Sequence, residues 1–439
     1  MPDKFKKYIL TLIVFGGFAL SIFWSFHYRI KPVVDAKAYD IIAMNLASGN
    51  GYRENLGMPL ENDYAIVRVG PFYEFFLAGI YKIFGHHYEI VWILQAILHV
   101  VSACLLYYIC RHLISGAVGE KAGLIAAGIF SFYPDLIEIS AMLMSETLYL
   151  FLFILMVYVF FVFFEKPGLK NSLWLGITSG LAIITRPPIL FLLPVIIFYF
   201  FKKMHWKRAL VASVIFLATI SAIFFPWTAR NYKIYDRFMP LGVAGSYNFW
   251  IGNYPGGSGE QGPTPEMHIF EKTHTALQIN DESIRQFKSF LLSHPLEFLR
   301  ITALRVNKYW SVIRPMGFWF YQTGIPQMLF VFSSAVASIV LFIFGLAGTL
   351  KSITDKNEKL YYLFAFAIIT PLILFATVVE TRYRFQIYPI LAIFVGFFLA
   401  GKEWWKKRVL YLAAGIVILN GIIDLALSFD VFKEKLLGF

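Results

Sequence analysis

The chain contains few charged residues and almost no cysteine. Only 15% of its 439 residues are Asp, Glu, Lys or Arg, whereas a soluble domain carries about 25%. Together with a hydrophobic content of 58% and a mean hydropathy of +0.64, this scarcity of charge excludes a soluble globular protein. The two cysteines, Cys104 and Cys110, lie in one apolar run but on different sides of a helix. We therefore expect neither a disulfide nor a metal site between them.

The hydrophobic residues occur in long runs along the whole chain. Such runs are typical of membrane-spanning helices, whereas barrel strands would show alternating hydrophobicity. The first run, residues 8–26, is too long for the apolar core of a signal peptide and lacks a small-residue cleavage site, so we interpret it as the first span. The net charge of +12 comes from Lys and Arg in short loops. Positive loops stay on the cytoplasmic side of a membrane, so the charge indicates topology and not nucleic-acid binding.

The positive loops also predict the orientation of the spans. Lys4, Lys6 and Lys7 place the N-terminus in the cytoplasm and the loop after residue 26 outside. Residues 70–84 are too short to cross a bilayer, so we expect a helix at the outer interface there. The predicted spans, eleven in all with the C-terminus outside, lie near residues 8–26, 89–111, 119–134, 143–164, 172–184, 187–201, 208–225, 327–350, 360–378, 385–401 and 409–427.

These spans predict an all-α polytopic membrane protein in three parts. An N-terminal transmembrane module of seven spans covers residues 1–226 and includes a first outer loop, residues 27–88. A second outer loop, residues 227–326, contains a Gly/Pro-rich segment and two amphipathic stretches, 281–295 and 295–313, which we expect to be interfacial helices. A C-terminal transmembrane module of four spans covers residues 327–439.

Carboxylates stand at two positions on the predicted outer face. Asp35 precedes an amphipathic segment, residues 36–47, that contains Asp40. Asp35 either caps this helix or projects into a cavity. Glu146 begins a later apolar helix, where it is either a first-turn acid favoured by the helix dipole or part of a polar site at membrane depth.

Arginines on the same predicted face supply the opposite charge. Each alone is typical of an interfacial anchor beside Trp or Tyr. Several together suit a phosphate or pyrophosphate, which guanidinium groups bind bidentately, and so indicate a lipid-phosphate carrier as ligand. The arginines considered for this role are Arg68, Arg230, Arg382 and Arg384, and Arg186 and Glu380 emerge on the same face.

Histidines in the second outer loop are the remaining candidates for a metal site. His268 and His274 lie near Glu266 and Glu271, but their spacing matches no common ligand motif. We expect no metal and no other cofactor, although the sequence does not exclude a divalent ion.

Several segments resemble bacterial GT-C membrane glycosyltransferases, in particular the family of protein O-mannosyltransferases and of the lipid A aminoarabinose transferase. The resemblance rests on DAKAYDIIAMNLASGNGY (35–52), VRVGPFYEFFLAGIYKIFG (67–85) and MSETLYLFL (144–152). Similar segments follow in the same order: ITRPPILFLLP (184–194), the stretch that begins FFPWTARNY at residue 224, and ETRYRFQIYPILAI (380–393).

The resemblance implies a GT-C bundle with a polyprenyl-phosphate-linked sugar donor and an inverting transfer to an extracytoplasmic hydroxyl on a protein, lipid or polymer. Asp35 matches the catalytic base of the family, Glu146 its second acid, and Arg68 a basic residue near the donor phosphate. Tyr39 and Asp40 belong to the same first-loop motif. The chain departs from the family at Ala36, where several relatives carry a second acid, and at VRVGP, where many have Arg-Pro-Pro, which puts the local turn in question.

Two other functions compete with this one. A flippase or transporter of lipid-linked oligosaccharide would bury charges along a pathway open to both faces, whereas the polar residues here gather on one face. An O-antigen-type ligase or polymerase would concentrate its chemistry in later outer loops. We expect an integral protein of the plasma (inner) membrane, with a cytoplasmic N-terminus and an extracytoplasmic active site, that contacts membrane lipid and no nucleic acid.

Overall fold

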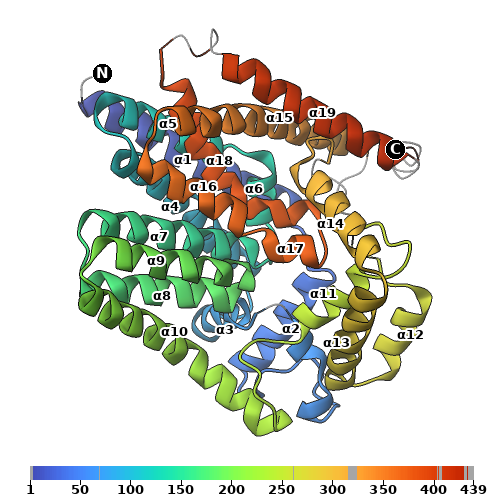
Figure 1. Cartoon of the computed structure of the whole chain (residues 1–439). Coiled ribbons are helices and arrows are strands. Elements are labelled where there is room, and N and C mark those ends of the chain that lie inside the picture. The colour runs from blue at the N-terminus through green and yellow to red at the C-terminus, as the bar shows by residue number, and fades with distance from the viewer. Residues whose placement is uncertain are drawn as a thin grey trace.

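The computed structural model describes residues 3–68, 70–260, 262–314, 324–402, 404, 408–429 and 433. Within these residues every regular element is an α-helix or a short 3-10 helix, and no strand occurs (Figure 1). The expected all-α membrane architecture is therefore confirmed.

In the described residues, seven helical stretches are long and apolar enough to cross a membrane, and an eighth is added if a pair bent by 56° counts as one span. The bent pair is α5 (Gly116–Ser131) and α6 (Pro134–Ser140). The seven are α1 (Asp3–Tyr28), α4 (Tyr88–Leu113), α7 (Glu146–Glu165), α10 (Trp206–Tyr235), α15 (Ile325–Thr354), the pair α16 (Glu358–Ile369) with α17 (Leu372–Ala376), and α19 (Arg408–Leu427).

The other predicted spans are helical but shorter or broken. They are α8 (Leu169–Thr185), η3 (Pro187–Leu192) with α9 (Leu193–Lys203), and η4 (Thr381–Ile387) with α18 (Tyr388–Leu399). Proline explains the break after α8, because it disfavours a helical conformation in the preceding residue. Arg186 precedes Pro187 and is extended, with φ −148° and ψ 121°. The predicted number of eleven spans thus remains a prediction.

A densely buried helix, α18, packs between α5 and α15 in the bundle. Nearly every residue of α18 is buried, which suits a segment that is apolar on all sides. Glycines allow its neighbours to approach closely: a Cβ on Gly396 would lie 2.2 Å from the carbonyl oxygen of Ala122 in α5. Likewise, a Cβ on Gly348 of α15 would lie 2.1 Å from the carbonyl oxygen of Phe394.

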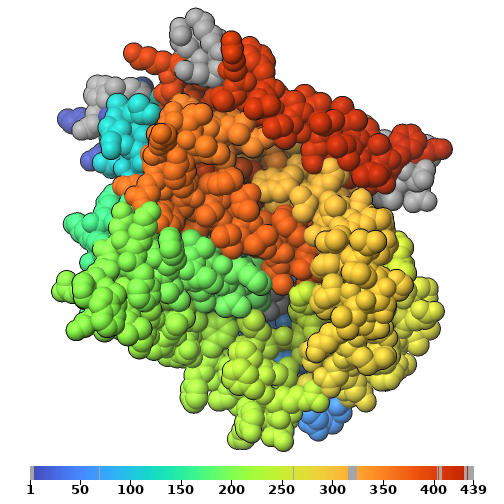
Figure 2. Space-filling view, in the orientation of Figure 1, coloured from blue at the N-terminus to red at the C-terminus, as the bar shows by residue number. Residues whose placement is uncertain are grey.

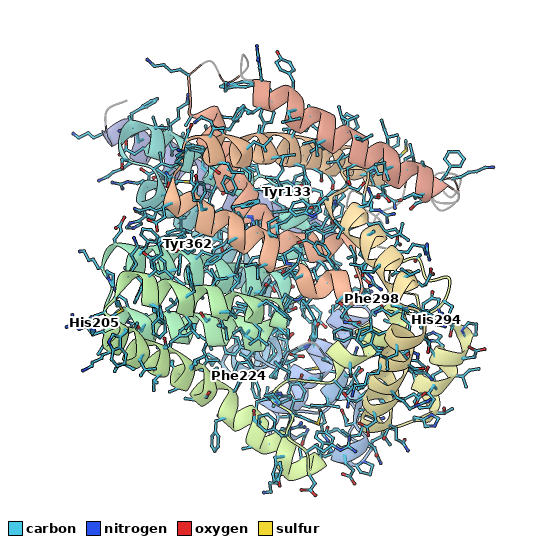
Figure 3. All side chains as sticks on the ribbon, in the orientation of Figure 1. Tyr133, His205, Phe224, His294, Phe298 and Tyr362 are labelled. Carbon is cyan, nitrogen blue, oxygen red and sulfur yellow. The ribbon has the colours of Figure 1, made fainter. Side chains whose placement is uncertain are left out.

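The remaining helices gather at one end of the bundle, which we call the site end. They are α2 (Asp35–Ala47), η1 (Leu60–Asn62), η2 (Tyr64–Val67), α3 (Phe72–Phe84), α11 (Ala244–Gly252), α12 (Pro265–Thr273), α13 (Ala276–Ser293) and α14 (Pro295–Trp310) (from the lower middle to the right in Figure 1). The turn between α9 and α10, marked by His205 in Figure 3, lies at the opposite end, far from His294 and Phe298 at the junction of α13 and α14.

Three sequence expectations concern this end. The segment at 70–84 is the 13-residue helix α3, which is too short to cross a membrane and packs against α2. Both amphipathic stretches of the second loop form helices, α13 and α14. The helix α10 continues through Pro226, where the predicted N-terminal module ends, as far as Tyr235.

Candidate functional site

Asp35 is the first residue of α2, and its carboxylate faces arginines from two other segments. Oδ2 lies 3.0 Å from Nη1 of Arg382, and Oδ1 lies 3.7 Å from Nη1 of Arg68. The preceding residue, Val34, has φ 47° and ψ −116°, a conformation that valine rarely adopts. This turn directs the start of α2 toward η4, so Asp35 is part of an ion-paired site.

Glu146 is the first residue of α7 and is almost fully buried. Its Oε1 lies 2.5 Å from Nη1 of Arg186 and 4.0 Å from Nη1 of Arg382. Neither carboxylate oxygen accepts a hydrogen bond from the described protein. The two arginines therefore neutralise Glu146 while leaving its oxygens able to accept from a ligand.

Arg382 links the two acids into a continuous chain of ion pairs. At one end Glu54 binds Arg68 through both carboxylate oxygens, at 2.8 and 2.9 Å from Nη2. At the other end Glu380 accepts from Nε of Arg382 at 2.8 Å. The members, which we call the ion-pair chain, are Glu54, Arg68, Asp35, Arg382, Glu380, Glu146 and Arg186.

The ion-pair chain joins segments that are far apart in sequence, and its four carboxylates exceed its three guanidinium groups by one. Excess negative charge keeps the arginines protonated. Burial alone would lower the pKa of Arg68, but the neighbouring carboxylates of Glu54 and Asp35 outweigh burial and raise it. The guanidinium groups of the ion-pair chain are therefore charged and held in place by the carboxylates.

A cavity of about 290 Å³ adjoins the ion-pair chain. Its polar end is formed by Glu146, Arg186 and Arg382, with Tyr149 and Gln386 nearby. Its walls are apolar and come from η3, α11 and α17, with Leu190, Phe191, Phe249, Ile373 and Leu374 among them. Figure 2 shows the surface hollowed between the green α9 segment, the orange α17 segment and the yellow helices of the site end. The cavity thus has a charged end and apolar walls, which suit the head of an amphipathic ligand.

Of two further residues of the first-loop motif, Tyr39 lies close enough to Arg68 and Arg186 to interact with them electrostatically, whereas Asp40 has other partners. Asp40 is buried, and its carboxylate contacts Tyr81 Oη at 2.7 Å, Tyr88 Oη at 2.7 Å and His86 Nε2 at 2.8 Å. The neighbouring Tyr39 is buried with its ring edge against Tyr73. Both residues fix α2 on α3 and the start of α4, and the Asp40 oxygens are fully used by these partners.

Two of the predicted phosphate ligands also bind elsewhere. Arg230 donates to the carbonyl oxygen of Tyr52 at 2.9 Å, and its guanidinium lies 5.0 Å from the Trp227 ring centre. Arg384 is buried and donates to the main-chain carbonyls of Ser311 and Arg314. Neither arginine is in the ion-pair chain or among the residues that line the cavity. The structure thus brings together Asp35, Glu146, Arg68 and Arg382, and separates Arg230 and Arg384 from them.

Two acids near the site, Glu54 and Glu74, are not among the predicted site residues. Glu54 holds Arg68, as described above. Glu74, in the first turn of α3, is buried and accepts from Tyr52 Oη at 3.0 Å. Burial raises the pKa of Glu74 to about 8, so its carboxyl group is mostly protonated at neutral pH. The signal for Glu74 was its place three residues after Pro71, in an otherwise apolar helix.

Of the histidines and acids considered for a metal, His268 and Glu271 form a pair, with His268 Nδ1 3.4 Å from the Glu271 carboxylate. Among the residues that the structure describes, no three His, Cys, Asp or Glu side chains form a metal-binding group. The His274 ring stacks on Phe270 with centres 3.7 Å apart, while Glu271 accepts from Tyr247 Oη. Among the described residues, guanidinium groups at the site can donate to an anionic ligand.

The chain has relatives in both sequence and fold. Residues 68–229 match the sequence model of the dolichyl-phosphate-mannose-protein mannosyltransferase family. The apo oligosaccharyltransferase of Archaeoglobus fulgidus is similar in structure, with a TM-score of 0.53 and 14% identity over 97% of this chain and 57% of that one. The same enzyme tethered to an acceptor peptide gives a TM-score of 0.51, with 14% identity over 97% of this chain and 56% of that one.

ArnT from Cupriavidus metallidurans bound to undecaprenyl phosphate gives a TM-score of 0.43 and 11% identity, over 88% of this chain and 76% of that one. No curated protein sequence matches the chain. The chain spans little more than half the length of the oligosaccharyltransferase, and at these identities the structural likeness shows the fold alone. The chain is thus an integral membrane protein whose fold is similar to that of the archaeal oligosaccharyltransferase, and its residues 68–229 match the sequence pattern of the dolichyl-phosphate-mannose-protein mannosyltransferase family.

Proposed function

We propose that this protein is an inverting glycosyltransferase that moves a sugar from a polyprenyl-phosphate carrier to a hydroxyl group outside the cytoplasm. The observation that carries the proposal is the junction of the ion-pair chain with the cavity. There, Glu146, Arg186 and Arg382 stand at the head of a pocket with apolar walls. A lipid-linked sugar phosphate has the same division between a charged head and an apolar tail.

Arg186 and Arg382 bind the donor phosphate in this proposal, with Arg68 beside them. A guanidinium group has five N–H donors, so each arginine can keep its carboxylate partner while it binds phosphate oxygens. The phosphate is a good leaving group, and fixed positive charge stabilises it further as the glycosidic bond breaks. Arg230 and Arg384 have the structural role of holding the main chain at residue 52 and at residues 311–314.

Asp35 is the general base. It takes the proton of the acceptor hydroxyl while that oxygen attacks the anomeric carbon from the side opposite the phosphate. The new carbon–oxygen bond forms as the bond to the phosphate oxygen breaks, and the phosphate leaves with the electron pair. Arg382, 3.0 Å from Asp35, connects the base to the leaving-group site. The anomeric configuration inverts in this single displacement.

Glu146 has a positioning role that follows from its burial. Removing one member of a buried ion pair leaves an uncompensated charge and costs about 3–5 kcal/mol. Glu146 thus keeps Arg186 and Arg382 at the head of the cavity, and its two oxygens remain able to accept from a sugar or acceptor hydroxyl. We assign the protein to the plasma (inner) membrane, with the site end on the extracytoplasmic side.

The test is mass spectrometry of envelope glycans in a strain that lacks the protein. The strain is complemented separately with the wild type, with Asp35→Asn and with Asp281→Asn, an exposed aspartate of α13 paired with Arg237. A glycan that is lost on deletion and restored by the wild type and Asp281→Asn, but not by Asp35→Asn, supports the proposal and identifies the sugar and the acceptor. Restoration by Asp35→Asn would refute the role of Asp35 as base.

Binding of the donor carrier provides a second, independent test. The purified protein is titrated with undecaprenyl phosphate, and quenching of tryptophan fluorescence reports binding. Arg382→Gln should weaken binding at least tenfold, because it removes a charged donor at the head of the cavity, whereas Arg230→Gln should leave it unchanged. Equal affinity of Arg382→Gln and the wild type would contradict the assignment of the phosphate site.

A further inference from the structure

The helix α14 has its polarity inverted relative to a helix on the surface of a soluble protein. Arg305 and Lys308 are buried, with exposed fractions of 0% and 6%. Leu296, Leu299 and Val306 are exposed by 80%, 61% and 37%. In water, both the hydrated apolar surface and the charges placed in the interior would cost free energy.

The exposed apolar residues form one continuous stripe. Leu296, Leu299, Ala303 and Val306 are all exposed and recur at intervals of three and four residues, which places them on one face of α14. The exposed Arg300 beside them forms an ion pair with Glu297 within the same helix. We call Leu296, Leu299, Ala303 and Val306 the α14 stripe.

The buried charges are bound to oxygens of the protein itself. Arg305 donates to the carbonyls of Gly252, Gly259 and Phe375 and to Oδ1 of Asn253. Lys308 donates to the carbonyl of Ser258 at 2.8 Å and to Glu260 at 2.7 Å. Charged side chains at membrane depth characteristically face the interior of the protein and pair with backbone carbonyls or with acids in this way.

The C-terminal part of α14 reaches the middle of two helices that can cross a membrane. The ring of Trp310 lies 6.1 Å from the ring of Phe342. Phe342 follows the start of α15 by 17 residues, or about 25 Å along the axis. Asn307 donates to Oδ1 of Asn420 at 2.8 Å, and Asn420 lies about 10 Å before the end of α19. Figure 1 shows α14 slanting into the bundle beside α17 and α19.

The stripe also continues an apolar surface that faces outward from α19. Ile416, Leu419 and Ile423 are exposed on that helix, which has the composition and length of a membrane span. Because Asn307 of α14 is hydrogen-bonded to Asn420 of α19, the exposed faces of the two helices meet at this pair. The same apolar surroundings therefore cover the exposed apolar faces of α14 and α19.

From these observations we infer that the α14 stripe contacts the hydrocarbon of the bilayer. The loop that follows α10 thus re-enters the membrane through α14. The interfacial position expected from the sequence is thus replaced by a deeper one, because Trp310 packs against Phe342 and the stripe adjoins the apolar face of α19. The helix α14 also packs against α17, whose Ile373 and Leu374 line the cavity, so lipid contacts on α14 lie next to the wall of the donor site.

The test uses spin labels on the full-length protein in vesicles of phosphatidylcholine and phosphatidylglycerol. Single cysteines are introduced as Leu299→Cys and Val306→Cys in a chain with Cys104→Ala and Cys110→Ala. Matched controls are Ile416→Cys on α19, for lipid, and Lys272→Cys on the exposed face of α12, for water. Collision of each label with oxygen and with a water-soluble nickel chelate is measured by electron paramagnetic resonance.

Labels at residues 299 and 306 should collide at least fivefold more with oxygen relative to the nickel chelate than the label at 272 does. The label at residue 306 should lie deeper than the one at 299 and approach the ratio at 416. Nickel collisions at 299 and 306 as frequent as at 272 would show that water covers the stripe and would overturn the inference. Low collision with both reagents would overturn it in favour of a protein partner. Neither result depends on sugar transfer, so the proposed function is tested separately.

Discussion

The buried aspartate of α2, Asp40, can be distinguished by experiment from Asp35, the carboxylate proposed as the general base. Asp40 is five residues from Asp35 and belongs to the same sequence motif, yet its oxygens are occupied by Tyr81, Tyr88 and His86. We predict that Asp40→Ala destabilises the protein, whereas Asp35→Asn leaves its stability nearly unchanged. The two variants therefore separate the framework of α2 from the site that α2 carries.

The size of the expected loss of stability follows from the contacts of Asp40. Removing a buried charged acceptor strands its partners and costs about 3–5 kcal/mol. An unfolding entropy of about 2.1 cal/mol/K per residue amounts to about 0.9 kcal/mol/K for 439 residues. The midpoint of thermal unfolding should therefore fall by about 3–5 °C for Asp40→Ala. Asp35 is partly exposed, and ion pairs of that kind contribute about 0–1 kcal/mol, so Asp35→Asn should shift the midpoint by about 1 °C or less.

The assay is thermal unfolding of the purified protein in one detergent at pH 7, followed by tryptophan fluorescence at a fixed heating rate. Asp281→Ala, which removes an exposed aspartate, is the matched control. A midpoint for Asp40→Ala within 1 °C of that control would refute the structural role of Asp40. A fall of several degrees for Asp35→Asn would show that Asp35 supports the fold as Asp40 does.

Three further predictions concern other residues of the site end. Burial raises the pKa of Glu74 to about 8 from its ordinary value of 4.5, so the contribution of its carboxyl group to stability is present below pH 4.5 and is lost as pH rises toward 8. Glu74→Gln should therefore raise the midpoint of thermal unfolding at pH 8 and match the wild type near pH 4.5. The same difference in midpoint at both pH values would contradict this. Val34 has φ 47° and ψ −116°, a conformation that glycine adopts freely. The variant Val34→Gly should therefore be more stable to thermal unfolding than the variant Val33→Gly, by about 1 kcal/mol. The reverse order would exclude strain at residue 34. Arg384→Ala should lower the midpoint of thermal unfolding by several degrees, because the carbonyls of Ser311 and Arg314 lose their donor. Arg382→Ala should abolish sugar transfer and lower the midpoint by less. Equal falls in midpoint would mean that the two arginines share one role.

Composition and hydrophobic runs were sufficient to predict the class of fold. A chain so poor in charge and so rich in long apolar runs has to satisfy its backbone inside a bilayer, and helices do so within each segment. The positions of helices α1, α4, α7 and α10 follow directly from these runs. The number of spans was less predictable, because near Pro187 and Pro389 short 3-10 helices precede shorter α-helices than the apolar runs predict.

The acids of the site could also be predicted from sequence, and for a physical reason. Asp35 and Glu146 are charged residues at the edges of apolar helices, and such positions are costly unless the charge has a partner. The structure provides that partner in Arg382, which lies within 4.0 Å of both acids. The sequence alone left open whether Asp35 caps α2 or enters a site, since both arrangements place an aspartate at the start of a helix.

What only the tertiary structure decided is which arginines face the acids. Arg382 and Arg384 are two residues apart in η4, yet Arg382 points to Asp35 and Arg384 points to the carbonyls of residues 311 and 314. Residues two apart in a tight helix project in different directions, and their partners come from segments distant in the chain. The polarity of α14 was hidden for the same reason. Its sequence is amphipathic, but only the packing of α17, α19 and the 258–260 segment shows that its charged face is the buried one. Sequence thus determined the medium in which the protein folds and where its acids lie, while long-range packing determined the direction in which each charge points.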